Sequence, residues 1–217
     1  ANINPKQPST NTPPEVLVIT SYPPRECGIA TYSHDLVKSL CKKYVDSLSV
    51  KICALESEKM GYTYPPEVKF TLNTSDAGEF PKIAAAINST NSIVTVLVQH
   101  EFGLYRQQES AFIQLLEKIT KPIMIVFHSV LPSPNEALKA MLMKIVNTCN
   151  SVVVMTNKSK ELLTKEYGVQ PHKIYVIPHG THLVEHIDKD TLKRKYGLEG
   201  RKVISTFGLL SSGKNLE

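Results

Sequence analysis

The chain has 217 residues, of which 41% are hydrophobic and 21% charged, and its formal net charge is +5. These values are ordinary for a folded globular protein of one domain, or of one domain and part of another. The modest charge, without interleaved aromatic and basic residues, leads us to expect no nucleic-acid partner. No apolar run approaches the roughly 18 residues of a membrane span, and no signal peptide begins the chain.

The cysteine pattern indicates a reducing compartment. The four cysteines show no C-x-x-C spacing and fall within otherwise regular elements; they are Cys27, Cys41, Cys53 and Cys149. We therefore expect free thiols in a cytoplasmic protein, without a disulfide framework or a zinc site.

Short apolar runs alternate with amphipathic segments after a polar tail at residues 1–14. Apolar runs predict strands at Glu15–Thr20, Ser49–Leu55, Val68–Leu72, Ile93–Gln99, Pro122–Phe127, Ser151–Met155 and Lys173–Ile177. Apolar positions at three- and four-residue steps predict helices at Ile29–Tyr44, Phe80–Asn88, Glu109–Ile119, Asn135–Thr148 and Ser159–Tyr167.

The order of these elements predicts the fold. Strands such as VTVLV and VVVM are apolar without alternation, which is typical of strands covered on both faces. Strands and helices that alternate along the chain favour a doubly wound, mostly parallel α/β sheet of the Rossmann-like kind. We expect this domain to span residues 15–180.

Residues 181–202 lose the strand pattern and gather basic residues around a short helical segment, so we interpret them as a linker. Val203–Phe207 again reads as a strand, and the glycine-rich segment after it predicts a phosphate loop with Lys214 facing the charge. The spacing from Gly208 to Lys214 matches a P-loop, but Asn215 replaces the Ser or Thr that would bind magnesium. We therefore interpret residues 203–217 as the start of a second Rossmann-like domain, not as a complete NTPase.

The ligand site of an open parallel sheet lies beyond the C-terminal ends of its strands. In the loop after the first strand, Gly28 opens the first helix and would let an anion approach the helix N-terminus. A single glycine does not make the G-x-G-x-x-G pattern, so a dinucleotide site is not expected.

Three histidines follow three of the strands, namely His100, His128 and His179. Their shared edge indicates that at least one contacts substrate, because imidazole can bind hydroxyl and phosphate groups. A zinc site formed by the three is the alternative, as in a metal-dependent hydrolase, but no short-spaced ligand pair supports it.

Taken together, the loop motifs resemble the N-terminal half of retaining GT-B glycosyltransferases of the group 1, or family 4, class. The similarity covers nearly all of residues 15–217. The motifs that carry it are SYPPRECGIATYSHDL, VQHEFGLY, VFHSVLPSP, VVVMTNKSKELL, IYVIPHGTH and VISTFGLLSSGKNLE.

The resemblance implies two Rossmann-like domains, of which the first binds acceptor and the second binds a UDP- or GDP-linked sugar. It implies hexose transfer to a saccharide or lipid acceptor, with the nucleotide-sugar as co-substrate and with neither cofactor nor metal. Association with a membrane surface is left open. The competing interpretation is a non-catalytic Rossmann-like module that binds a sugar or nucleotide.

The resemblance also assigns roles to single residues. His128 matches the catalytic histidine beside the transferred sugar, and Gly28 and Lys214 match residues that bind the donor phosphates. Arg25, His100 and Glu101 are placed on the acceptor side. Leu209 stands where many relatives have Arg. Because the motif that reads the donor is absent, we expect this chain to be inactive by itself.

Overall fold

The computed structural model describes residues 13–57, 61–105, 107–181 and 185–205. These belong to two compact units, Ala1–Pro178 and His179–Glu217, and each unit is described by itself. Within the described ranges, no helix is long and apolar enough to cross a membrane.

The first unit is built on one sheet of seven strands in the order β3-β2-β1-β4-β5-β6-β7, and every neighbouring pair is parallel. The doubly wound α/β fold is therefore confirmed, and the sheet is entirely parallel where a mostly parallel one was expected. The strands are β1 (Glu15–Thr20), β2 (Ser49–Glu56), β3 (Val68–Asn73), β4 (Ile93–His100), β5 (Ile123–Phe127), β6 (Ser151–Val154) and β7 (Ile174–Val176).

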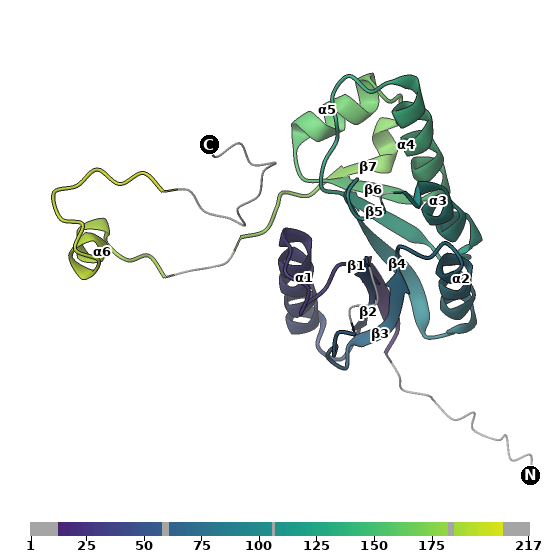
Figure 1. The fold of residues 1–217 in the computed structure, drawn as a ribbon, viewed down its shortest axis with the longest axis horizontal. Coiled ribbons are helices and arrows are strands. Elements are labelled where there is room, and N and C mark those ends of the chain that lie inside the picture. Colours follow the sequence, from purple (N-terminus) through teal and green to yellow (C-terminus); the bar gives the residue numbers. More distant parts are fainter. Residues whose placement is uncertain (1–12, 58–60, 106, 182–184, 206–217) are drawn as a thin grey trace, which may run out of the picture. The chain divides into compact units, whose positions relative to one another are not determined.

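Helices cover both faces of this sheet (Figure 1). One face packs against α1 (Gly28–Tyr44), which lies over β1 and β2. The opposite face packs against α2 (Glu79–Ser89), α3 (Glu109–Lys118), α4 (Glu136–Thr148) and α5 (Asn157–Lys165). Burial between these layers explains why the central strands are apolar along their whole length.

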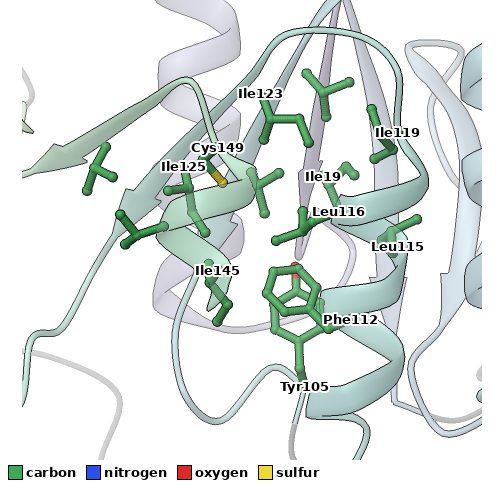
Figure 2. Close-up of a cluster of buried hydrophobic side chains, with 14 of the residues drawn as sticks. Ile19, Tyr105, Phe112, Leu115, Leu116, Ile119, Ile123, Ile125, Ile145 and Cys149 are labelled. Carbon is green, nitrogen blue, oxygen red and sulfur yellow. The ribbon is translucent and has the colours of Figure 1, made fainter. Parts of the chain in front are cut away.

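The larger core cluster lies between the sheet and helices α2 to α5. Its centre holds the rings of Tyr105 and Phe112, which are stacked with centroids 3.8 Å apart (Figure 2). Ile19 of β1 and Ile125 of β5 belong to the same cluster and are fully buried. This packing holds the ends of the central strands in fixed positions.

The strand order reverses between β1 and β4. The chain proceeds from β1 outward to β2 and β3, then returns to the other side of β1 with β4. A sheet of this type binds its ligand at the C-terminal ends of the two strands that flank the reversal. The loops that follow Thr20 and His100 therefore define where a site should be sought.

The second unit contains the short helix α6 (Lys189–Lys195), which has no buried residue. Asp188 caps it by accepting a hydrogen bond from the Thr191 amide at 2.9 Å. Residues 201–205 have no regular secondary structure, and Ile204 is 97% exposed. The strand predicted from Val203 is thus absent from its described residues. The rest of it, with the predicted phosphate loop and Lys214, lies outside the described residues.

Candidate active site at the β1–β4 reversal

The loop after β1 delivers the N-terminus of α1 to the strand reversal. Cys27 caps this helix, and its Sγ accepts a hydrogen bond from the Ala30 amide at 3.3 Å. Gly28 follows and is exposed, and a Cβ atom added to it would meet no described atom within 4 Å. The first turn of α1 is therefore open to an approaching group. The unpaired amides of a helix N-terminus favour an anion there.

Arg25 ties this loop to the neighbouring strand. Its Nη1 donates to the Leu55 carbonyl oxygen, 3.2 Å away, near the end of β2. The side chain is only partly buried, and a guanidinium group has further N–H donors besides the one that bonds Leu55. The position agrees with a binding role, and the acceptor assignment itself stays a prediction.

His128 lies at the reversal, directly after β5, and its ring contacts two elements. Its Nε2 lies 2.8 Å from Oε1 of Gln99, which belongs to β4. The ring also meets Tyr32 of α1 edge to face, with centroids 5.0 Å apart and planes at 89°. The His128 amide donates to the His100 carbonyl at 3.0 Å. These contacts place the imidazole between α1 and the ends of β4 and β5.

His100 occupies the opposite face of the sheet, inside the core. It is 3% exposed and contacts the rings of four aromatic residues, which are Phe102, Tyr105, Phe112 and Phe127. Burial, reinforced by the nearby His128, lowers the pKa of His100 to about 4. The predicted contact with an acceptor does not agree with this position, because the ring offers almost no surface. Its neutral form is part of the hydrophobic packing.

Glu101 joins the loops that follow β4 and β5. Its Oε1 accepts a hydrogen bond from the Phe102 amide at 3.1 Å, and its Oε2 accepts one from the Ser129 hydroxyl at 2.7 Å. The carboxylate thus holds the residue next to His128 in place. A partly buried carboxylate at this point can also meet a ligand hydroxyl, which stays a prediction.

The two strand-end histidines of the first unit do not share a face of the sheet. His100 and His128 lie on opposite faces of the sheet, and the exposed His179 belongs to the second unit. Across the described part of the chain, no group of three or more His, Cys, Asp or Glu is arranged to hold a metal ion. The zinc alternative therefore has no support from the described residues.

Gln99 and Tyr32 contact His128 but were not among the residues predicted for the site. Gln99 could have been singled out, because it is an amide at the end of an otherwise apolar strand and is fully buried. Tyr32 carried no such signal, since its spacing within α1 matched that of ordinary core residues.

Comparison with protein families adds the deciding observation, because the model described as Glycosyltransferase Family 4 matches residues 28–185. The chain belongs to glycosyltransferase family 4. The resemblance to GT-B glycosyltransferases is thereby confirmed. The matched range contains Gly28, Gln99, Glu101 and His128, so the family's domain includes the site described above.

A solved structure of an alpha-glucosyltransferase shares the fold of this family 4 chain. A complex with UDP and a 13-mer DNA containing a HMU base matches with a TM-score of 0.51 at 10% identity, covering 78% of this chain and 43% of the other. A complex with UDP matches with a TM-score of 0.48 at 12% identity, covering 81% and 41%. The chain thus spans about two fifths of the length of these structures. No match was found among curated proteins.

The expectation that nucleic acid is excluded as a partner is wrong. The alpha-glucosyltransferase that shares this fold was solved in complex with DNA. The exclusion was based on net charge and composition, which describe the whole surface, whereas a nucleic acid contacts only part of it. A modest total charge therefore does not decide whether a chain of this fold binds DNA.

Proposed function

We propose that this chain is the acceptor-binding part of a retaining glycosyltransferase that transfers a hexose from a UDP- or GDP-linked sugar. Membership of family 4 supports the reaction class. The observation that carries the proposal is the pairing, at the strand reversal, of an open α1 N-terminus with a fixed His128. That arrangement supports a site for phosphate beside a site for a sugar hydroxyl.

The electrostatic part of the mechanism concerns the leaving diphosphate. As the bond between sugar and phosphate breaks, negative charge grows on the phosphate oxygens, and donors already aimed at them lower the barrier. The amides at the start of α1 serve this role at Gly28, and Lys214 adds a positive charge. With these groups in place, the reaction requires no metal ion and no cofactor other than the nucleotide-sugar.

The positional part of the mechanism concerns the transferred sugar and the acceptor. His128 contacts the sugar from the α1 side of the sheet, where Tyr32 and Gln99 hold its ring. Arg25, near the end of β2, and Glu101, which bonds the neighbour of His128, offer a donor group and an acceptor group to the incoming hydroxyl. This chain covers 43% of the length of the matched structure, and we infer that a second domain completes the donor site. The isolated chain is then inactive.

The test is sugar transfer by the full-length protein that contains this chain. UDP- and GDP-hexoses labelled in the sugar are offered with a saccharide acceptor and, separately, with duplex DNA. We expect transfer from one donor class without added metal, and a product that retains the anomeric configuration. Binding of nucleotide-sugar without transfer to any acceptor would contradict the enzyme and favour the binding module.

The His128→Ala variant tests the assigned site within the same assay. We expect kcat to fall by about 10²-fold, which is typical when one donor to a developing charge is lost. The matched control is His172→Ala, because His172 is exposed and lies in the short 3-10 helix before β7, at the other edge of the sheet. Equal kcat and KM in wild type and His128→Ala would remove His128 from the site.

A further inference from the structure

Gln99 is a polar side chain in a place where the fold has no general need for one. It is fully buried in a strand whose other residues near the sheet centre are apolar. Burying an amide without a hydrogen bond costs roughly 1–3 kcal/mol. The partner that Gln99 has is His128, at 2.8 Å, while its Nε2 has no hydrogen-bond partner among the described residues. The Gln99 side chain is thus oriented so that its oxygen contacts His128, while its nitrogen stays without a hydrogen bond among the described residues.

We propose that Gln99 is the positioning residue of His128. A carboxamide oxygen can only accept a hydrogen bond, so the bond at 2.8 Å requires that the neutral imidazole carry its proton on Nε2. Tyr32, packed edge-on at 89°, fixes the plane of the ring. Together they select one tautomer and one orientation. The role in catalysis rests on the proposed function, whereas the choice of tautomer does not.

Two titratable groups beside this pair are neutral near pH 7. Burial raises the pKa of Tyr32, which approaches from α1, and lowers the pKa of His100, which is the neighbour of Gln99 in β4. Neither of these two groups supplies a charge to the imidazole. The contact of Nε2 with the Gln99 oxygen favours one tautomer, and substitution of that amide should release it.

The experiment is nitrogen NMR of the histidine rings in the ¹⁵N-labelled 217-residue chain, above the pH at which His128 titrates. We expect the wild-type His128 ring to be protonated on Nε2. In Gln99→Met, which keeps the length of the side chain and removes the acceptor, we expect a mixture of tautomers. Gln114→Met is the matched control, since Gln114 is exposed on α3, and it should leave the His128 spectrum unchanged.

A wild-type ring protonated on Nδ1 would overturn the proposal, because the amide nitrogen of Gln99 would then be the donor. A Gln99→Met chain with the wild-type tautomer would also overturn it. If that variant does not fold, Gln99→Glu decides, because a carboxylate keeps the oxygen and should raise the pKa of His128 by about one unit or more. An unchanged His128 pKa would count against the role. These NMR measurements need no transferase activity. They can therefore refute the role of Gln99 without bearing on the proposed function.

In the full-length transferase, Gln99→Met should lower kcat and leave the KM for the donor nearly unchanged. A misplaced ring affects the transition state, whereas the donor is held by other groups. A change in KM alone would contradict a positioning role.

Discussion

Gln99 and His100 are neighbours in β4, but their side chains lie in different surroundings. Side chains alternate between the faces of a strand, so Gln99 points to the α1 side with His128, and His100 points into the aromatic cluster. The Nδ1 atom of His100 has no hydrogen-bond partner among the described residues. A buried imidazole in such surroundings is stable only while it is neutral.

His100 should make the stability of the chain depend on acid. Its pKa is about 4 in the folded chain and near the ordinary 6.5 in the unfolded chain, so the unfolded chain takes up the proton first. The stabilisation is complete above pH 6.5 and is lost as the pH falls toward 4, by roughly 3 kcal/mol. In His100→Phe, urea unfolding between pH 7.5 and 4.5 should show a smaller loss than in wild type. The exposed His172→Phe should behave like wild type, and an equal loss in both variants would refute the argument.

The same pair shows how far the sequence could predict the site. The apolar runs predicted the strands closely, and Glu15–Thr20 has the same limits in sequence and structure. Neighbouring residues of a strand point to opposite faces of the sheet, so a shift of one residue decides which side chain faces the ligand. The apolar pattern of the sequence does not determine which face each residue takes, because this depends on packing. The role of His128 therefore stays a prediction from its motif, and the burial of His100 in the aromatic cluster was not foreseen. The role of Lys214 stays a prediction.

At the scale of elements, one polar side chain joins the ends of α2 and α3 where the chain enters β5. Asn88, at the end of α2, accepts hydrogen bonds from the amide and the hydroxyl of Thr120 at 2.9 and 3.0 Å. Its Nδ2 donates to the Lys118 carbonyl at 2.8 Å. One side chain thus closes the C-terminus of α3 and directs the chain into β5, the strand that ends at His128.

Asn88→Ala should destabilise the chain by about 2 kcal/mol, because it removes three hydrogen bonds and leaves a helix end without its cap. Asn91→Ala is the matched control, since Asn91 is an exposed residue three positions later and should change stability by less than about 0.5 kcal/mol. Urea unfolding monitored by circular dichroism measures both. Equal midpoints for the two variants would show that the Asn88 contacts contribute nothing.

At the scale of the whole molecule, the two units differ in how much they bury. The first contains both hydrophobic clusters, whereas α6 of the second has no buried residue. Folding stability should therefore reside in the first unit. The division between the two units falls between Pro178 and His179.

A chain shortened to end at Pro178 should unfold with the same free energy as the full 217 residues, within about 0.5 kcal/mol, and with the same dependence on urea. The control is a chain that ends at Lys173, which loses β7 and the buried Ile174 and should be markedly less stable. A lower urea midpoint for the chain ending at Pro178 would mean that residues beyond it contribute to the core.

The strand reversal also has a consequence for folding. β1 pairs with β2 after one helix, but its pairing with β4 must wait until residues 93–100 have joined the sheet. Contacts distant in sequence cost more chain entropy and form later. The start of α1 and the ends of β4 and β5 come together only when β1 pairs with β4; we call this pairing the seam. A ligand that touches both sides of the seam binds only the closed form, so it would slow local opening of the sheet as well as occupy the site.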